Sequence, residues 1–312
     1  MKVPAKQTVA VIDIGSNSIK LLVVRRGMSG NLETVKARTL DARISAGISA
    51  KDPKLSDEGM TRGMGAIREL LDEASNFSPT KTILVATSAV RDAKNGAQFR
   101  EKILKATGKT IRILTGDEEA TLIGKGLVCD PALSQLTDFY VFDLGGGSLE
   151  CLAFKGRKIK QSMSLPLGCV RLTEQFVKDP QAPFDAALAV DLHVKEVMEK
   201  SGFKFNLGAV PAIGTGGTLT SVRAIRAADT DTTVERTRAA IPMAELTDLL
   251  AKITPLTVDL RQKIPGLPKA RADVFPVALQ TVITLAQLGG FPKYDHSLYN
   301  LRWGLAAEAF EA

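Results

Sequence analysis

The chain has 312 residues, enough for one large domain or two of ordinary size, with 45% hydrophobic and 24% charged residues. This composition is that of a soluble globular protein, and apolar runs such as Val9–Ile12 are strand-sized and too short to span a membrane. The net charge of +7 fits either a polyanionic partner or a dispersed basic surface, whereas 5% aromatic residues and no Lys/Arg block argue against nucleic-acid binding by base stacking.

The N-terminus passes from a short basic stretch directly into a strand pattern, without the apolar core of a signal peptide, so we expect a cytoplasmic location and no membrane association. Three widely spaced cysteines lack a CxxC pair, which argues against disulfides and a cysteine-ligated zinc. The two histidines, His193 in a helical pattern and His296 in a turn-like segment, are expected to be structural. Catalysis would then use carboxylates, arginines, backbone amides and a hard metal ion.

A strand–turn–strand pattern occurs twice, 130 residues apart: VIDIGSNSIKLLVV at residues 11–24 and VFDLGGGSLECLAF at residues 141–154. Three small or polar positions coincide, namely Asp13 with Asp143, Gly15 with Gly145, and Ser18 with Ser148. Each copy has the pattern of a β-hairpin. Two unrelated hairpins that use common turn residues are the alternative, but the matching order of polar and apolar residues favours a duplicated unit.

These turns are suited to phosphate. Because glycine and serine are small, consecutive backbone N–H groups can converge on one anion, and serine hydroxyls add further donors. The aspartate that ends the preceding strand lies where it can hold Mg²⁺ beside a phosphate. The turns therefore predict a phosphate clamp made by Ser16, Asn17, Ser18, Gly145, Gly146, Gly147 and Ser148.

Further along the chain, strands and helices alternate. Apolar residues at helical spacing mark a helix, and three apolar runs predict strands at residues 82–87, 111–114 and 139–143. The helix face consists of Met60, Met64, Ile67, Leu71 and Ala74. Such alternation predicts an α/β fold with mixed sheets. Together with the duplicated hairpin it predicts two units, with a boundary within residues 129–138.

A third glycine-rich turn contains Gly214, Gly216, Gly217 and Thr218. Leu219, Val222 and Ile225 follow at helical spacing, so the turn leads into a helix N-terminus, where free N–H groups favour anions. The pattern matches neither the Walker A motif nor the dinucleotide-binding fingerprint. A plain strand-to-helix turn is the alternative.

Several charged residues are candidates for catalysis. Arg91 offers a planar guanidinium that matches phosphate oxygens, although an arginine beside Asp92 could also be an ordinary surface residue. Glu118 and Glu119 head a predicted helix, where acids are common for dipole reasons alone, so this pattern does not choose between them. Glu150 is unusual as an acid within an apolar strand pattern, which favours a functional role.

With these residues assembled, the sequence resembles the exopolyphosphatase / guanosine pentaphosphate phosphatase (Ppx/GppA) family. Six segments match in the family's order: DIGSNSIKL (13–21), ATSAVRDAKNG (86–96), GDEEATLI (116–123), DLGGGSLE (143–150), LPLGCVRLTE (165–174) and GTGGTLTSV (214–222). The resemblance implies two ribonuclease-H-like domains of the actin, sugar kinase and heat-shock chaperone group with an interdomain cleft. We expect residues 1–127 with about 298–312 in the first domain and 128–297 in the second.

The resemblance also implies roles for individual residues. Glu119 would orient or deprotonate the attacking water, with Arg91 on the phosphate chain. Asp143 and Glu150 would surround Mg²⁺ (or Mn²⁺) or the reacting phosphoryl group, and Asp13 is a third candidate metal ligand. The cradle for the phosphates would comprise Ser16, Asn17, Ser18, Gly145, Gly146, Gly147 and Ser148, closed by Gly216, Gly217 and Thr218.

The expected activity is release of terminal orthophosphate from inorganic polyphosphate, with short chains favoured, and conversion of guanosine pentaphosphate to the tetraphosphate. The resemblance is to the short form of the family, without the C-terminal HD-type domain, and a homodimer is expected. The final segment at residues 299–309 only approximates the family's usual Gly-Leu-Arg-Glu-Gly ending. A phosphotransferase of the same fold group and a non-catalytic phosphate-chain sensor are the alternative functions.

Overall fold

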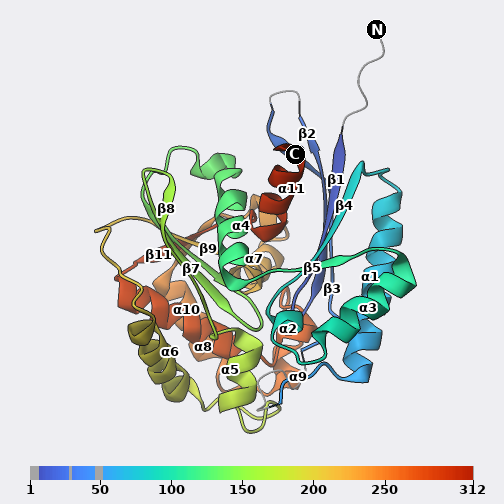
Figure 1. Cartoon of the computed structure of the whole chain (residues 1–312). Coiled ribbons are helices and arrows are strands. Elements are labelled where there is room, and N and C mark those ends of the chain that lie inside the picture. Colours follow the sequence, from blue (N-terminus) through green and yellow to red (C-terminus); the bar gives the residue numbers. More distant parts are fainter. Residues whose placement is uncertain (1–6, 28–29, 46–51, 312) are drawn as a thin grey trace. The chain divides into compact units, whose positions relative to one another are not determined.

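The computed structural model describes residues 7–27, 30–45 and 52–311, so most of the N-terminal basic stretch lies outside it. The chain forms two compact units: unit 1 comprises Met1–Ser134 and Tyr299–Ala312, and unit 2 comprises Gln135–Leu298. Each unit contains one mixed β-sheet with helices, as the sequence predicts (Figure 1).

The sheet of unit 1 has the strand order β3-β2-β1-β4-β5. β1, β2 and β3 are antiparallel neighbours, whereas β4 is parallel to β1 and β5 is parallel to β4. β1 lies at the centre and is buried along most of its length, in keeping with its run of Val, Ala and Ile. The bounds are β1 Thr8–Ile14, β2 Ile19–Arg26, β3 Leu32–Leu40, β4 Lys81–Ala86 and β5 Ile111–Ile113.

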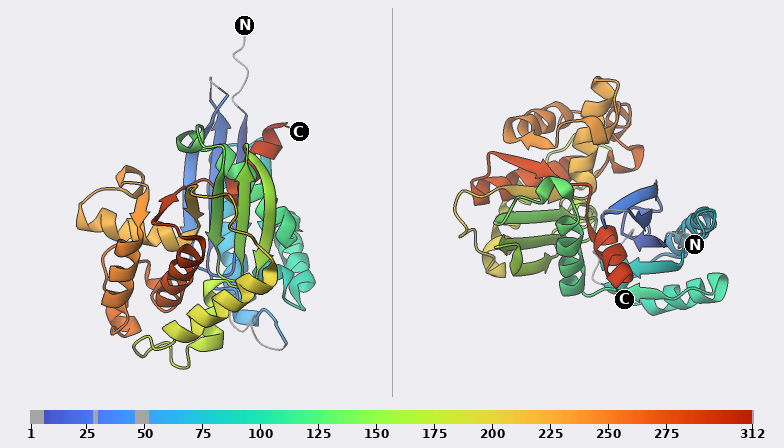
Figure 2. Two further views of the ribbon diagram at one scale, coloured as in Figure 1. Left: turned by 90° about the vertical axis from the view of Figure 1, so that its left-hand side faces the viewer. Right: turned by 90° about the horizontal axis from the view of Figure 1, so that it is seen from above.

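Local sequence explains where the helices of unit 1 begin. In α1 the Ser56 side chain accepts a hydrogen bond from the Gly59 amide at 3.0 Å, and a capping box of Thr115 and Glu118 starts α4. The C-terminal helix α11 packs beside α4 within the same unit (Figures 1 and 2). The bounds are α1 Asp57–Ser75, α2 Ser88–Arg91, α3 Gly96–Thr107, α4 Gly116–Val128 and α11 Leu301–Glu311, with a short 3₁₀ helix at Pro131–Leu133.

The sheet of unit 2 repeats this arrangement with one further edge strand, in the order β10-β11-β9-β6-β7-β8. β6, β7 and β8 are antiparallel neighbours, while β9 is parallel to both β6 and β11. β10 pairs with β11 in antiparallel orientation. The bounds are β6 Phe139–Leu144, β7 Leu149–Lys155, β8 Lys158–Leu165, β9 Ala212–Thr215, β10 Ala240–Pro242 and β11 Lys293–His296.

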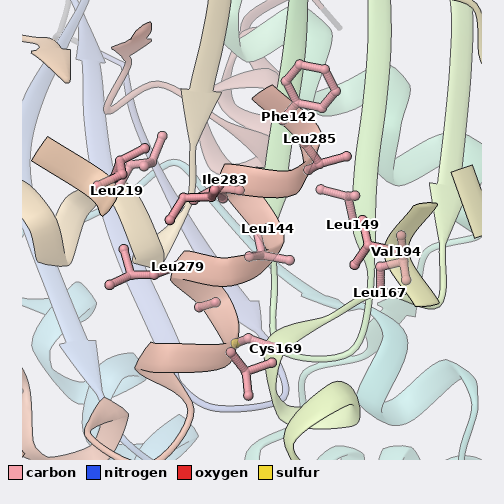
Figure 3. Close-up of a cluster of buried hydrophobic side chains, with 14 of the residues drawn as sticks. Phe142, Leu144, Leu149, Leu167, Cys169, Val194, Leu219, Leu279, Ile283 and Leu285 are labelled. Carbon is pink, nitrogen blue, oxygen red and sulfur yellow. The ribbon is translucent and has the colours of Figure 1, made fainter. Parts of the chain in front are cut away.

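Helix α10 is the centre of the core of unit 2. It is buried along nearly all of its length, and Leu279, Ile283 and Leu285 from this helix belong to the same apolar cluster as Leu144 and Leu149 from the sheet (Figure 3). A helix that is apolar on all sides is stable only when it is covered on all sides, which fixes α10 in the interior. The helices are α5 Cys169–Phe176, α6 Ala187–Ser201, α7 Gly217–Asp229, α8 Met243–Ile253, α9 Val258–Arg261 and α10 Phe275–Gly289, with 3₁₀ helices at Val234–Arg236 and Lys269–Arg271.

The predicted hairpins are both present. β1 pairs with β2 from Thr8 opposite Arg25 to Ile14 opposite Ile19, and β6 pairs with β7 from Phe139 opposite Phe154 to Leu144 opposite Leu149. In the part of the chain that the structure describes, every helix is too short or too polar to cross a lipid bilayer.

Candidate functional site

The turn between β1 and β2 carries the first group of predicted phosphate ligands. It is closed by a hydrogen bond from the Gly15 amide to the Ser18 carbonyl oxygen at 3.2 Å. The side chain of Asn17 is buried, and neither its amide oxygen nor its amide nitrogen has a hydrogen-bond partner among the described residues. Because buried polar groups are almost always paired with protein, water or a ligand, these two atoms are available for a partner outside the described chain. Ser16 lies beside Ser88, with 3.3 Å between the hydroxyl oxygens, at the start of α2.

The turn between β6 and β7 is built the same way, with the Gly145 amide donating to the Ser148 carbonyl oxygen at 3.0 Å. Its carbonyl groups are held by the N-terminus of α5. The bonds run from the Cys169 amide to the Gly145 oxygen at 3.0 Å, from the Val170 amide to the Gly146 oxygen at 2.9 Å, and from Nε of Arg171 to the Gly147 oxygen at 2.9 Å.

These carbonyl bonds decide where the amides of the turn point. In a planar trans peptide the C=O and the N–H point in opposite directions. Since the carbonyls of Gly145, Gly146 and Gly147 face α5, the N–H groups of Gly146, Gly147 and Ser148 face away from it. Three consecutive amides directed the same way form an anion-binding concavity.

Gly168 permits this contact between α5 and the turn. A Cβ atom at this position would lie 2.2 Å from the Gly147 carbonyl carbon and 2.4 Å from the Gly146 carbonyl oxygen. The LPLGCVR segment is therefore needed to build the phosphate-binding turn, although its residues come from a different part of the chain.

Two carboxylates lie opposite each other just before the second turn. Asp143 on β6 pairs in register with Glu150 on β7, so their side chains leave the same face of the sheet, with Cβ atoms about 4.5–5.5 Å apart. Glu150 is 1% exposed and accepts a hydrogen bond from the Ser164 hydroxyl at 2.7 Å. The pair is chemically suited to Mg²⁺, which takes oxygen ligands and is often bound by one or two carboxylates together with substrate phosphates.

No group of three or more His, Cys, Asp and Glu side chains that could hold a metal occurs among the described residues. One or two carboxylates are enough for an Mg²⁺ ion that takes its other ligands from substrate phosphates and water.

The first unit differs at the equivalent position. Asp13 pairs in register with Lys20 where the second unit has a second acid. Burial raises the pKa of Asp13, while the positive charges of Lys20 and Arg302 act in the opposite direction. A cationic neighbour disfavours a metal ion at Asp13 and favours a phosphate. Lys20 was not among the sequence-based candidates, but its alignment with Glu150 in the duplicated hairpin is a signal that could have found it.

The third turn leads from β9 into α7. Gly216 has a left-handed backbone (φ +91°), and a Cβ there would lie 2.4 Å from Oδ1 of Asp143, so this turn packs directly against the acidic pair. The hydroxyl of Thr218 is buried without a hydrogen-bond partner among the described residues. A Cβ at Gly217 would lie 2.0 Å from Nη2 of Arg271, which places a guanidinium at the turn that sequence reasoning missed.

Arg91 and Glu119 form a pair in unit 1. Nη1 of Arg91 donates to Oε2 of Glu119 at 2.9 Å and to the Leu114 carbonyl oxygen at 3.2 Å, and the side chain of Glu119 is 8% exposed. The neighbouring Glu118 has a different role. Its carboxylate accepts from the Thr115 amide at 2.8 Å, and a hydrogen bond from Arg112 lowers its pKa. The capping box thus occupies Glu118 and leaves Glu119 directed toward Arg91.

The sequence-predicted site residues therefore form two groups. Unit 1 supplies Asp13, Ser16, Asn17, Ser18, Arg91 and Glu119, and unit 2 supplies Asp143, Gly145, Gly146, Gly147, Ser148, Glu150, Gly216, Gly217 and Thr218. Within unit 2 the structure brings the second turn, the third turn and the acidic pair together.

Comparison with known proteins identifies the family of this chain. The family model described as the Ppx/GppA phosphatase family matches residues 22–288. The chain belongs to the Ppx/GppA phosphatase family. Proteins named guanosine-5'-triphosphate,3'-diphosphate pyrophosphatase from Vibrio campbellii and Vibrio parahaemolyticus are 31% and 32% identical over 282 and 287 residues. These matches cover 88% and 89% of this chain, which spans 54% of the length of each relative.

Solved structures of Ppx/GppA proteins have the same fold. A crystal structure described as an exopolyphosphatase from Cytophaga hutchinsonii superposes with a TM-score of 0.86 at 22% identity, covering 98% of each chain. The Aquifex aeolicus member of the Ppx/GppA family superposes with a TM-score of 0.79 at 22% identity, covering 98% of this chain and 99% of that one. The predicted α/β fold with two units, each built on a mixed sheet, is confirmed and is the fold of these Ppx/GppA structures.

Replacement of Gly168 tests how the second turn is built. Gly168→Ala places a methyl group within the backbone of the turn, so we expect a loss of roughly 1–3 kcal/mol in the free energy of unfolding and weaker binding of pyrophosphate. Gly65→Ala is the matched control, because Gly65 lies on α1 with open space around its Cβ position. It should leave binding unchanged and the stability equal or up to about 1 kcal/mol higher. Urea unfolding and calorimetry measure both effects, and unchanged affinity in Gly168→Ala would contradict this account of the turn.

Proposed function

We propose that this Ppx/GppA family member is a phosphohydrolase that removes the terminal phosphoryl group from short inorganic polyphosphate and from guanosine pentaphosphate. The observation that carries the proposal is the second turn, whose three consecutive amides are directed to one side by the bonds from α5. The acidic pair Asp143 and Glu150 lies beside that turn. The names of the Vibrio relatives and of the Cytophaga protein support the same class of substrate.

The chemistry that we propose needs little from the protein beyond positioning and charge. A water oxygen attacks the terminal phosphorus in line with the bridging oxygen, the bond to that bridging oxygen breaks, and orthophosphate leaves. Glu119 orients the water and accepts its proton. Arg91 exchanges its bond to Glu119 for a bond to a phosphate oxygen, which frees the carboxylate for the water.

We propose that the amides of Gly146, Gly147 and Ser148 hold a phosphate of the substrate and that Ser16, Asn17 and Ser18 form a second phosphate-binding turn. The unpaired amide of Asn17 and the unpaired hydroxyl of Thr218 support ligand-binding roles for the first and third turns. Lys20 and Arg271 would add positive charge to the bound chain.

A divalent cation is part of the proposal. Asp143 and Glu150 would hold it together with phosphate oxygens of the substrate, and Asp13 is disfavoured by the adjacent Lys20. Such an ion neutralises charge that develops on the phosphoryl oxygens.

The preference for short chains has a structural argument. A long polyphosphate needs cationic groups along its path, and four basic residues of unit 2 are engaged within the protein instead. Lys195 pairs with Asp191, Lys200 pairs with Glu196 and Arg226 pairs with Glu245, while Arg223 is buried.

Phosphate release tests the function directly. Short polyphosphate, long polyphosphate and guanosine pentaphosphate are compared under identical conditions at two ionic strengths, with kcat/KM as the readout. We expect the short chain and the guanosine nucleotide to be better substrates than chains of hundreds of units, and long-chain activity to fall steeply with salt. Efficiency that rises continuously with chain length would contradict the preference. Absence of release would favour a sensor, and ATP turnover that depends on a carbohydrate or carboxylate acceptor would favour a kinase.

Removal of the proposed base should separate binding from turnover. We expect Glu119→Gln to lower kcat by roughly 10²–10⁴-fold, with pyrophosphate affinity changed little, because the amide cannot accept the proton of the water. Glu118→Gln is the matched control: it removes only a cap and a surface ion pair, so kcat should stay close to the wild-type value. Activity of Glu119→Gln within a few-fold of wild type would move the role to another carboxylate.

The acidic pair should set the metal requirement. We expect hydrolysis to stop in excess chelator, and Asp143→Asn to raise the Mg²⁺ concentration needed for half-maximal activity, because one hard oxygen ligand loses its charge. Asp185→Asn serves as a control, since Asp185 is an exposed aspartate of unit 2 that lies outside the acidic pair. Full activity in chelator would show that no divalent ion is involved.

A further inference from the structure

A buried cation and a buried imidazole lie together in unit 2. Arg223 on α7 is 4% exposed and His296 at the end of β11 is 5% exposed. Nε of Arg223 donates to the Thr237 hydroxyl oxygen at 2.9 Å, Nη2 donates to the Thr237 carbonyl oxygen at 2.8 Å, and Nη1 lies 3.0 Å from Nδ1 of His296. The arginine is thus held by neutral acceptors, one of which is the imidazole.

This contact fixes the tautomer of His296. A guanidinium only donates hydrogen bonds, so Nδ1 must accept, and in a neutral ring the proton is then on Nε2. Burial, reinforced by the charge of Arg223, lowers the pKa of His296 to about 3. The imidazole is therefore neutral at any pH at which hydrolysis would be measured.

The Nε2–H group of His296 connects the imidazole to the third turn through Thr220. Nε2 lies 3.2 Å from Oγ1 of Thr220, and this hydroxyl donates to the Gly216 carbonyl oxygen at 2.7 Å. Arg223, His296, Thr220 and Gly216 thus form one chain of hydrogen bonds that runs from the guanidinium to a backbone carbonyl. The chain ends at the glycine that packs against Asp143.

The end of this chain reinforces a peptide at the start of α7. The Gly216 carbonyl oxygen accepts from the Thr220 backbone amide at 3.3 Å, and the Thr220 hydroxyl adds the shorter bond of 2.7 Å. The Gly216 carbonyl and the Gly217 amide belong to one planar peptide, so holding the carbonyl directs the amide the opposite way. We propose that His296 is a positioning residue that acts through Thr220 to orient the Gly216–Gly217 peptide, so that the Gly217 amide binds a phosphate of the substrate. The inference rests on the proposed function, and it assigns a role to a histidine that the sequence suggests is only structural.

Two variants of His296 separate positioning from structural support. In His296→Gln the side-chain amide nitrogen takes the place of Nε2 and can still donate to Thr220, whereas the contact of Nδ1 with Arg223 is lost. In His296→Asn the amide oxygen takes the place of Nδ1 and can still accept from Arg223, whereas the donor to Thr220 is lost. Thr220→Val removes the hydroxyl itself, and His193→Gln on α6 is the matched control.

The experiment measures pyrophosphate affinity by calorimetry, KM and kcat for short polyphosphate, and stability in urea. We expect His296→Asn and Thr220→Val to weaken pyrophosphate binding and raise KM by roughly 3–10-fold, the usual effect of one hydrogen bond, with no further loss in the double variant. His296→Gln should keep the affinity and lose stability, and His193→Gln should change neither. Side-chain nitrogen NMR should show the proton of His296 on Nε2, assigned by comparison with His193→Gln.

Three results would overturn the inference: a proton on Nδ1, equal pyrophosphate affinity in all variants, or affinity that falls in His296→Gln and is retained in His296→Asn. The last pattern would mean that the histidine serves only to support Arg223. A wild-type protein that binds pyrophosphate but releases no phosphate would overturn the proposed function alone, because the affinity still reports on the turn.

Discussion

The orientation of peptide groups at the glycine turns is the constraint on which the candidate site depends. The C=O of one residue and the N–H of the following residue belong to the same planar peptide and point in opposite directions. When that N–H is directed at an anion, the C=O of the same peptide therefore needs a hydrogen-bond partner on the opposite side. In the second turn that partner is the N-terminus of α5, and in the third turn it is Thr220. In the first turn the Asn17 carbonyl accepts from the Arg43 amide at 2.9 Å.

The two hairpins show how a repeated scaffold can provide two kinds of chemistry. Both have the same four-residue turn, closed by the same hydrogen bond, and both place an aspartate just before it. The residue opposite that aspartate differs, being Lys20 in one unit and Glu150 in the other. A cation beside an acid favours an anionic phosphate, while a second acid favours a cation. The residue opposite the aspartate thus gives the two hairpins different electrostatic environments, Lys20 in the first and Glu150 in the second.

The buried polar side chains differ in whether the protein supplies their hydrogen-bond partners. The core of unit 2 holds Arg223 and His296 at low exposure because their donors and acceptors match one another. The amide of Asn17 and the hydroxyl of Thr218 are equally buried but lack such partners among the described residues. Since desolvating an unpaired polar group costs about 1–3 kcal/mol, the buried side chains of Asn17 and Thr218 are the ones whose polar atoms a ligand would satisfy under the proposed function.

The sequence alone determined the elements and the turns. Period-2 and helical patterns, small residues in the turns and the capping residues all act over a few positions, so the two hairpins, the helix after Gly216 and the α/β class could be predicted from them. The resemblance to the Ppx/GppA family added the expected arrangement of these elements in two domains. The Asp143–Glu150 pairing also follows from the hairpin register, because the turn between them is short.

Only the tertiary structure decided which groups meet across long stretches of chain. Glu119 contacts Arg91, 28 residues away, and the local sequence does not show that contact. The Thr-x-x-Glu pattern of the capping box accounts only for Glu118. Arg271 at Gly217 and His296 at Thr220 likewise come from distant segments. Such contacts depend on how strands and helices pack, and packing is a property of the whole unit that residue spacing does not encode.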